Sequence, residues 1–301
     1  MWGKKNKITG KVCLCTITTP DYMPGTLVML HTFFKYNDWF TGDILIFGIR
    51  LSNVDCELLK KFPRVKFVDF PSDLASAMKP IYCERTDLKD KEPLFCTLAI
   101  FGLKGYDKYI FVDSDAFFQS GIYKPVSKVK GIMFSPDRPA HMGRVRDRIM
   151  YKMISNSEKG VNYWENTFNT GVIIGDRSYF NKKTYQELLQ LLQPEYFVPL
   201  RRSANDQYLL NRYFENNYTP LSAKYNYRLG LAKVLKKKWV TLDNAAVIHF
   251  SGKKNPWNPD HALSEVMKQP IYLKAFRKWM NEYEDCLGAL AEKGINWRNH
   301  V

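Results

Sequence analysis

Two acidic residues separated by a single residue, Asp113 and Asp115, follow directly after the apolar run at residues 109–112. Ligands of open α/β sheets bind beyond the carboxyl ends of the strands, which is where this pair would lie. Carboxylates so spaced can point to the same side and bind a hard divalent cation that also takes phosphate oxygens as ligands. Because Asp-x-Asp is also common in solvated turns, the tripeptide alone leaves a metal site and a surface turn equally open.

A second apolar run, at residues 246–250, contains His249 and is followed by Gly252, Lys253 and Lys254. One imidazole and two carboxylates form a mixed nitrogen and oxygen ligand set that suits manganese. A histidine at the end of a strand is more often only hydrogen-bonded, but the glycine and the lysines change this balance. They offer close backbone approach and positive charge, which a bound diphosphate needs. The pattern therefore favours a site for a metal ion and a diphosphate.

Two polar motifs lie between these runs: Phe-Asn-Thr-Gly at residues 168–171 and Asn-Asp-Gln-Tyr-Leu-Leu-Asn at residues 205–211. The apolar spacing of the second motif and the residues after it predicts a helix over residues 206–214. Asp206 and Gln207 would then project from the amino-terminal end of that helix. An aspartate at this position can also simply cap the helix, so a structural role for Asp206 stays open.

The elements that would position these residues alternate between strands and helices in the first half of the chain. The expected order is strand 12–18, helix 25–35, strand 44–47, helix 53–62 and strand 65–70. This order predicts an α/β fold with a Rossmann-like, mostly parallel central sheet and flanking helices.

A further helix is expected over residues 92–104, directly before the strand that leads to the acidic pair. Leu94, Leu98 and Phe101 would face inward, and Gly105 would serve as the carboxyl-terminal cap. The second half is less regular, with a basic insertion, a strand, the helix that carries Asp206, another strand and two peripheral helices at residues 144–164, 171–175, 206–214, 246–250 and 262–293. No repeat or linker interrupts the sequence, so a single domain is the simplest organisation.

The composition is that of a folded, strongly basic protein. Its 301 residues are 45% hydrophobic, which is enough to fill an ordinary core. A net charge of +15 attracts nucleic acid, anionic membranes or phosphorylated substrates. No apolar run approaches the ~20 residues that span a bilayer, and no apolar leader follows Met1, so we expect a cytoplasmic protein. The six cysteines lack metal-ligand spacing, which favours reduced, mostly buried thiols.

Taken in order, the acidic pair, Phe-Asn-Thr-Gly, Asp-Gln-x-x-Leu-Asn and the closing His-Phe-x-Gly-x-x-x-Pro-Trp resemble glycosyltransferase family 8. This family includes glycogenin, bacterial lipopolysaccharide galactosyltransferases and plant galactinol synthases. The resemblance covers about residues 12–257 and implies a GT-A fold and a retaining, metal-dependent transferase that uses a UDP-sugar donor. It places a transferase domain at residues 1–260 and a helical extension, packed on that domain, at residues 261–301.

The resemblance also implies which residues contact the donor. Thr18, Thr19 and Tyr22 would bind the uracil, the tyrosine by stacking. The sugar and the diphosphate would be contacted by residues spread along the chain, namely Ser114, Asp137, Asn169, Thr170, Asp206, Gly252 and either Lys253 or Lys254.

The same resemblance implies how the reaction is catalysed. Asp113, Asp115 and His249 would bind manganese, or magnesium in its place, between the protein and the two donor phosphates. A bound metal ion stabilises the departing diphosphate without transferring a proton. Gln207, expected beneath the anomeric carbon, is a poor nucleophile, which favours front-face attack by an acceptor hydroxyl over a covalent route. Gln207 and Asp206 would stabilise the cationic sugar ring.

Three features depart from the family pattern. Asn255 stands where similar proteins have a lysine before Pro-Trp, and Thr97 stands where a basic residue is usual, so Arg85 would have to compensate. No tyrosine like the self-glucosylated one of glycogenin lies between Tyr227 and Trp239, so we do not expect a glycogen primer. The two lost basic positions leave a degenerate protein, which binds a UDP-sugar without transferring it, as an alternative.

The positive charge allows two further alternatives. A nucleic-acid-binding protein is the one from another class, although the chain lacks zinc-knuckle spacing and a basic aromatic sheet motif. Peripheral membrane contact is the other, because residues 271–280 interleave aromatic and basic side chains as interfacial helices do. In the simpler arrangement, Leu273, Phe276 and Met280 of that helix pack on the domain. The sequence leaves the donor sugar, the oligomeric state and the acceptor (glycan, protein or small molecule) open.

Overall fold

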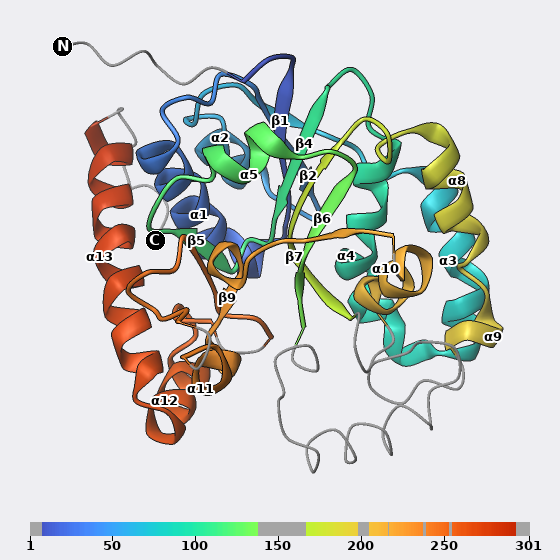
Figure 1. Ribbon diagram of the computed structural model, residues 1–301. Coiled ribbons are helices and arrows are strands. Elements are labelled where there is room, and N and C mark those ends of the chain that lie inside the picture. Colours follow the sequence, from blue (N-terminus) through green and yellow to red (C-terminus); the bar gives the residue numbers. More distant parts are fainter. Residues whose placement is uncertain are drawn as a thin grey trace.

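The structure, a computed structural model, describes residues 8–137, 167–197, 205–215, 217–236, 239–252 and 255–292. Its centre is a seven-stranded sheet in the order β3-β2-β1-β4-β7-β6-β8 (Figure 1). The strands are β1 (Val12–Thr18), β2 (Asp43–Gly48), β3 (Val65–Phe67), β4 (Lys108–Val112), β6 (Ile132–Pro136), β7 (Phe168–Asp176) and β8 (Thr219–Pro220). Neighbours from β3 to β4 pair in parallel, whereas β7 runs antiparallel between β4 and β6. The expected mostly parallel sheet is confirmed.

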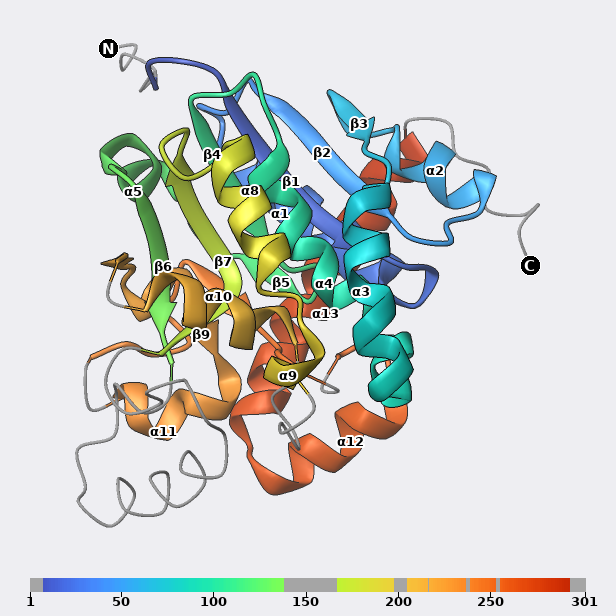
Figure 2. The ribbon, with the colours of Figure 1, turned by 90° about the vertical axis from the view of Figure 1, so that its right-hand side faces the viewer.

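Helices cover both faces of this sheet because its strands direct alternate apolar side chains into two cores. Cys13 and Cys15 of β1 face one core, and Leu14 between them faces the other. The first core is closed by α3 (Ser72–Glu84), the 3-10 helix η3 (Cys96–Gly102), α8 (Lys182–Gln190), α9 (Pro194–Phe197) and α10 (Asp206–Phe214), which lie in front of the sheet in Figure 2. The second core is closed by α1 (Met23–Tyr36), α2 (Asn53–Leu59) and α5 (Tyr123–Lys128).

A small second sheet, ordered β5-β10-β9, links the acidic pair to the histidine. Its strands are β5 (Ala116–Phe118), β10 (Val247–His249) and β9 (Tyr227–Arg228). β5 begins directly after Asp115 and pairs antiparallel with β10, so that Ala116 lies opposite His249. The short helices η4 (Ala223–Tyr225), η5 (Leu229–Leu231) and α11 (Ala232–Leu235) pack with this sheet in a third core.

The helix expected over residues 92–104 is wrong in its type and in part of its inward face. The segment consists of α4 (Glu92–Phe95) followed by η3, and it is preceded by another 3-10 helix, η2 (Thr86–Lys91). Because a 3-10 helix has three residues per turn, Leu98 and Phe101 share a face within η3, and both are fully buried. Leu94, in the preceding α-helical turn, is 46% exposed. Gly105 lies beyond the end of η3, in a turn with φ of +93°.

The boundaries of two other early elements are shorter than expected. The helix expected over residues 53–62 ends at Leu59, and the strand expected over residues 65–70 ends at Phe67. Ser52 starts the helix with a capping box, because its hydroxyl accepts from the backbone N–H of Asp55 while the Asp55 carboxylate accepts from that of Ser52.

Two helices follow β10, as expected for residues 262–293: α12 (Pro259–Lys268) and α13 (Ile271–Glu292). The predicted packing face of α13 is wrong in two of its three residues. Phe276 is buried, but Leu273 and Met280 are 40% and 42% exposed. The buried side of the helix instead carries Tyr272 in place of Leu273 and Trp279 in place of Met280. α13 lies along α1 in Figure 1 and contributes to both the second and the third core.

Most of the cysteines are buried, as expected. Cys13, Cys15, Cys96 and Cys286 are buried, Cys56 is half-buried and Cys83 is exposed, and none of the six forms a disulfide. Among the described helices, none combines the length and the apolar composition required to cross a bilayer. The basic insertion expected at residues 144–164 lies outside the described residues.

Candidate active site

The acidic pair is held by backbone hydrogen bonds at the carboxyl end of β4. The N–H of Asp113 donates to the carbonyl of Gly171 on β7 over 2.9 Å, and the N–H of Ala116 closes a turn onto the Asp113 carbonyl. The carbonyl of Asp115 accepts from the N–H of Phe250, the residue after His249. These bonds explain why residues more than 130 positions apart in the sequence meet at one point.

Asp113, Asp115 and His249 form a compact group of candidate metal ligands. Their ligand atoms all lie within 4.8 Å of one another. His249 Nε2 lies 3.1 Å from Asp115 Oδ1 and 3.6 Å from Asp113 Oδ2. The side chains of Asp115 and His249 are only 8% and 3% exposed, whereas that of Asp113 is 38% exposed and faces the outside of the group. The oxygen Asp115 Oδ1 is buried, and apart from this contact with His249 Nε2 it has no hydrogen-bond partner in the described part of the chain.

This group fits a divalent cation. A buried carboxylate oxygen that faces only an imidazole nitrogen among the described residues is poorly compensated, and a cation bound between the two atoms would compensate it. Burial raises the pKa of Asp113 to about 7, and the neighbouring charges of Asp115 and Asp206 add to this effect, although His249 opposes it. Burial lowers the pKa of His249, but the two carboxylates outweigh burial and leave that pKa raised. Two carboxylates and an imidazole nitrogen are a ligand set that manganese or magnesium accepts.

His249 is the first member of a continuous chain of side-chain hydrogen bonds. Its Nδ1 lies 2.8 Å from Asn226 Oδ1, and Asn226 Nδ2 donates to Asn169 Oδ1 over 2.8 Å. Asn169 Nδ2 donates to Gln207 Oε1 over 2.7 Å, and Gln207 Nε2 donates to Asp137 Oδ2 over 3.2 Å. The metal ligands and three residues expected at the donor sugar are therefore joined through Asn226.

This series of hydrogen bonds ends at a half-buried ion pair. The guanidinium of Arg228 donates to Asp137 Oδ1, and the two side chains are 13% and 19% exposed. Asn226 and Arg228 flank Tyr227 in the sequence, and the side chains of Asn226 and Arg228 contact the site while that of Tyr227 lies in the third core. This alternation is that of a strand, and it puts a basic residue into the site that the family pattern did not indicate.

Asp206 lies at the start of α10 but does not cap it. The cap is Asn205, whose side chain accepts from the N–H of Tyr208. The Asp206 carboxylate instead accepts from the hydroxyl of Thr170 over 3.3 Å. Burial raises the pKa of Asp206 to about 6, even though hydrogen bonds from the Gln207 backbone and from Thr170 lower it. Thr97, at the position where a basic residue was expected, donates its hydroxyl to the carbonyl of Leu94 over 3.1 Å and supplies no charge to the site.

The residues expected at the uracil lie where β1 meets α1. Thr18 is 1% exposed, and its hydroxyl is bonded to that of Thr26 over 2.6 Å. Thr19 and Tyr22 are half-buried, and Tyr22 packs edge-on against Trp257 with ring centroids 5.8 Å apart. Burial and the charges of Asp115 and Asp113 raise the pKa of Tyr22, while a hydrogen bond with Asn255 lowers it.

Ser114 and Gly252 complete the set of donor contacts expected from the sequence. The hydroxyl of Ser114 donates to the carbonyl of Ile17 at the end of β1. Gly252 has a φ of +81°, a conformation that favours glycine, and a Cβ there would meet no atom within 4 Å. Lys253 and Lys254 lie outside the described residues.

Arg85 is engaged elsewhere. Its guanidinium donates twice to Asp87 and once to the carbonyl of Phe197 at the end of α9. No contact that the structure describes joins it to the acidic group. Arg228 is the arginine that the structure does connect to this network, through Asp137.

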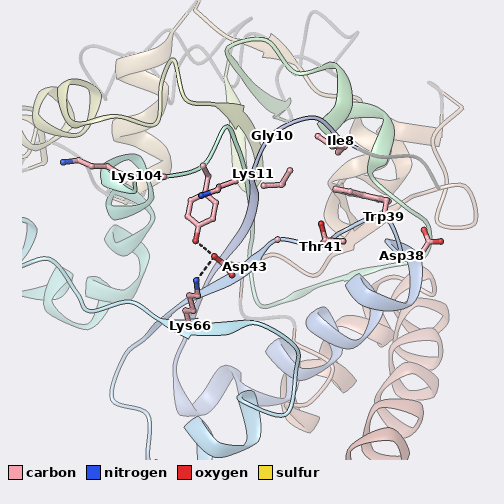
Figure 3. A pocket seen from close by; sticks show the side chains of 13 residues that line it. Ile8, Gly10, Lys11, Asp38, Trp39, Thr41, Asp43, Lys66 and Lys104 are labelled. Carbon is pink, nitrogen blue, oxygen red and sulfur yellow. Dashed lines mark hydrogen bonds and ion pairs between the residues drawn. The ribbon is translucent and has the colours of Figure 1, made fainter. Parts of the chain in front are cut away.

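A cavity of about 620 Å³ lies at the opposite edge of the sheet from this group. Figure 3 shows its lining, which includes Trp39, Lys11 and an Asp43 carboxylate bonded to Lys66 and Tyr106. The lining comes from the amino ends of β1 and β2, whereas Asp113 and His249 lie at carboxyl ends. The candidate metal ligands therefore do not belong to this cavity.

Comparisons with known proteins show the family to which the sequence is similar. The chain matches the glycosyl transferase family 8 model over residues 13–261. It is 26% identical over 274 residues to uncharacterized protein R707 of Acanthamoeba polyphaga mimivirus, a match that covers 87% of this chain and 89% of that protein. It is 32% identical over 124 residues to galactinol synthase 6 of Arabidopsis thaliana, which covers 39% of this chain and 33% of that protein.

Solved structures show the same architecture. Galactosyltransferase LgtC in complex with donor and acceptor sugar analogs matches with a TM-score of 0.70 at 14% identity, covering 96% of this chain and 100% of that one. Mouse xyloside xylosyltransferase 1 matches with a TM-score of 0.54 at 14% identity, covering 82% and 98%. At such identities the likeness concerns the fold. The family match spans most of the sequence, and the chain therefore belongs to glycosyltransferase family 8 and is a glycosyltransferase with a GT-A fold.

Proposed function

We propose that this protein transfers a sugar from a UDP-sugar to an acceptor hydroxyl and depends on a divalent cation, manganese or magnesium, for the transfer. The observation that carries this proposal is the compact group of Asp113, Asp115 and His249, in which the buried Asp115 Oδ1 faces His249 Nε2. The group lies at the carboxyl edge of the sheet, where open α/β folds bind nucleotides.

The residues of the group would each have one task in the reaction. Asp113 and Asp115 would supply oxygen ligands, and His249 would supply Nε2, to a cation that neutralises the charge developing on the departing diphosphate. Asp113, the more exposed of the two carboxylates, faces the side from which phosphate oxygens can complete the coordination. The charges of both carboxylates raise the pKa of Tyr22, so this residue is electrostatically coupled to the metal ligands that the diphosphate would approach.

The donor sugar would lie over Asn169, Asp206 and Gln207. The Gln207 amide is held at both ends, since its oxygen accepts from Asn169 and its nitrogen donates to Asp137. An amide held in this way can orient its dipole toward a cationic ring but is a poor nucleophile. We therefore propose retention of configuration by front-face attack, in which the leaving phosphate oxygen takes the proton of the acceptor hydroxyl. Trapping of a sugar on Asp206, detected by mass spectrometry, would overturn this route.

The nucleotide end of the site supports a uridine donor. Tyr22 offers one aromatic face beside Thr19, and Trp257 fixes the position of its ring from the other side of the loop. The indole N–H of Trp257 donates to the carbonyl of Asp21 over 2.9 Å, which ties the segment after β10 to the start of α1. Stacking on such a ring stabilises a planar base without selecting its sugar.

The donor is identified by a panel of UDP-glucose, UDP-galactose, UDP-N-acetylglucosamine and UDP-xylose. Release of UDP from each would be measured with and without Mn²⁺. We expect metal-dependent turnover of one sugar in preference to the others. No metal-dependent turnover of any of the four, with candidate acceptors present, would contradict the transfer reaction.

A catalytically degenerate protein is the second candidate. Two phosphate-contacting basic residues of the family pattern are replaced here by Thr97 and Asn255, which carry no charge. Against this candidate, the metal ligands, Asp206 and Gln207 are all present, and hydrogen bonds through Asn226 and Asn169 join His249 to Gln207. Tight binding of UDP together with the absence of turnover would favour the degenerate protein.

A further inference from the structure

The direction of every hydrogen bond around Asn226 follows from one backbone group. The N–H of Gly171 lies 3.1 Å from the Asn169 side chain and can only donate, so the atom that it contacts is Oδ1. Asn226 contacts this same oxygen over 2.8 Å and must therefore present its NH₂ group. The other end of the Asn226 amide, which faces His249, is then the oxygen.

The tautomer of His249 follows in turn. An amide oxygen 2.8 Å from Nδ1 requires that Nδ1 carries the proton. In the neutral imidazole, Nε2 then presents a lone pair toward Asp115 and Asp113. A lone pair directed at two carboxylates is repulsive unless a proton or a metal cation lies between them, and Nε2 is the atom that a metal cation would bind.

The same asparagine also fixes the donor-sugar side of the site. Asn169 Oδ1 accepts from Gly171 and from Asn226, so the Asn169 NH₂ group is left to donate to Gln207 Oε1. This bond orients the Gln207 amide, whose own NH₂ group donates to Asp137. Asn226 is 3% exposed, and the two groups that it contacts lie at opposite ends of its amide.

We propose that Asn226 is a positioning residue that couples the metal site to the donor-sugar site. Its oxygen holds His249 in the tautomer that binds a cation through Nε2, and its NH₂ group fixes the orientation of Asn169 and Gln207. The coupling to a donor rests on the proposed function, whereas the tautomer is a property of the chain itself. Asparagine suits this position because a donor and an acceptor are both required, and a carboxylate there would bring two oxygens together at Asn169.

The tautomer can be tested in the unmodified chain. Long-range proton–nitrogen NMR of the metal-free protein, at a pH where the imidazole is neutral, identifies which ring nitrogen of His249 carries the proton. We expect the proton on Nδ1. A proton on Nε2 would overturn the proposal without any variant being made.

The contribution to metal binding is tested with Asn226→Ala. The affinity for Mn²⁺ would be measured in the presence of saturating UDP, from the electron paramagnetic resonance signal of unbound Mn²⁺. Loss of an outer partner of a metal-bound histidine typically weakens metal binding by about 10- to 100-fold, and we expect a loss of this size. Tyr227→Phe is the matched control, because Tyr227 directly follows Asn226 in the sequence but packs in the third core, and this variant should bind Mn²⁺ as the unmodified chain does.

The Asn226→Asp variant tests the contribution of the amide oxygen separately from that of the NH₂ group. An aspartate still accepts from His249 Nδ1, so Mn²⁺ affinity should stay within about threefold of the unmodified chain. The aspartate cannot donate to Asn169. The ratio of the affinity for the UDP-sugar to the affinity for UDP should therefore be smaller in this variant than in the unmodified chain. A Mn²⁺ affinity unchanged in Asn226→Ala would overturn the proposal, and so would an equal loss in Asn226→Ala and Asn226→Asp.

Failure of this inference and failure of the proposed function give different results. A chain that binds neither Mn²⁺ nor UDP contradicts the proposed function, and the NMR measurement still decides the tautomer. A chain that binds both, and whose variants at Asn226 bind them equally well, contradicts the role of Asn226 alone. If Asn226→Ala does not fold, the Asn226→Asp variant and the NMR measurement decide whether Asn226 has the proposed role.

Discussion

At the residue scale, the site is a set of carboxylates held where their negative charge is unfavourable. Asp206 is 6% exposed, and burial raises its pKa to about 6. Burial is also the main cause that raises the pKa of Asp113 to about 7. Shifted pKa values of this kind are common at binding and catalytic sites, where a ligand supplies the compensating charge. A metal ion would supply that charge at Asp113, and a cationic sugar ring would supply it at Asp206.

The charge on Asp206 should therefore cost stability when no donor is bound. A carboxyl group whose pKa is raised in the folded state binds its proton more tightly there than in the unfolded state. Its contribution to stability is thus lost as the pH rises from about 4 to about 6. We expect Asp206→Asn to increase the free energy of unfolding at pH 8 by about 1–3 kcal/mol and to abolish sugar transfer. Urea denaturation of the metal-free protein measures the first effect.

The control for this prediction is a carboxylate on the surface. Asp38 is exposed, and Asp38→Asn should change the free energy of unfolding by less than about 0.5 kcal/mol. The gain in Asp206→Asn should also shrink by about half at pH 5, where much of the native carboxyl group is protonated. A gain that is independent of pH would show that the charge is not its cause.

The spacing of residues identified some members of the site and missed others. Asp113, Asp115 and His249 follow apolar runs, which is a signal that a sequence displays openly. Arg228 belongs to the two-residue strand β9, which is too short to produce an apolar alternation, and Asn226 directly precedes that strand. Their roles depend on contacts with His249 and Asp137, about 20 to 90 positions away, which no local pattern encodes.

At the scale of elements, β7 positions both halves of the site. Its residue Gly171 accepts from the N–H of Asp113, donates to Asn169 and lies against the His249 ring. A Cβ at this glycine would lie 2.2 Å from His249 Cε1, a distance that no packed side chain tolerates. The glycine of Phe-Asn-Thr-Gly is thus required for the histidine to reach the acidic pair.

Gly171→Ala should therefore displace the imidazole. We expect Mn²⁺ affinity to fall by at least about tenfold and the free energy of unfolding to fall by about 1–3 kcal/mol, as for other overpacked sites. Gly288→Ala is the matched control, because a Cβ there meets no atom within 4 Å and the position lies inside α13. It should stabilise the protein by up to about 1 kcal/mol and leave Mn²⁺ affinity unchanged. Equal Mn²⁺ affinity in the two variants would contradict the role of Gly171.

Periodicity predicted the regular elements better than the irregular ones. The helix over residues 206–214 and the strand over residues 12–18 have the expected boundaries, because their apolar spacing is uniform from end to end. The segment of α4 and η3 changes from an α-helical to a 3-10 period between Phe95 and Cys96. A single period applied across that change assigned Leu94 to the wrong face.

At the scale of the whole molecule, α13 is built into the fold. Tyr272 and Trp279 are at most 1% exposed in the third core, and Cys286 and Leu290 close the second core against α1. We therefore expect a chain that ends at Asp260 to lose cooperative unfolding, because deleting several large buried side chains removes more free energy than a domain typically has in reserve. A chain that ends at Glu292 is the control and should melt cooperatively. Cooperative melting of the shorter chain would show that residues 261–301 are an independent extension.

Net charge and surface composition are also properties of the whole molecule. The net charge of +15 and the exposed Leu263, Met267, Leu273 and Met280 leave peripheral membrane contact as a prediction from the sequence. Lys278, which lies in α13 with Leu273 and Met280, is paired with Asp243, so part of the basic charge of that helix is already neutralised within the protein.

The central claim is that Asp113, Asp115 and His249 bind a divalent cation without which a UDP-sugar is not cleaved. The most direct test compares UDP release by the unmodified chain and by Asp115→Ala at increasing Mn²⁺ concentration, with the melting temperature of both as a check of folding. Our account predicts saturable, Mn²⁺-dependent release that is lost in Asp115→Ala while the variant stays folded. Release that is equal in the two chains, or that is unaffected by removal of metal with a chelator, would contradict it.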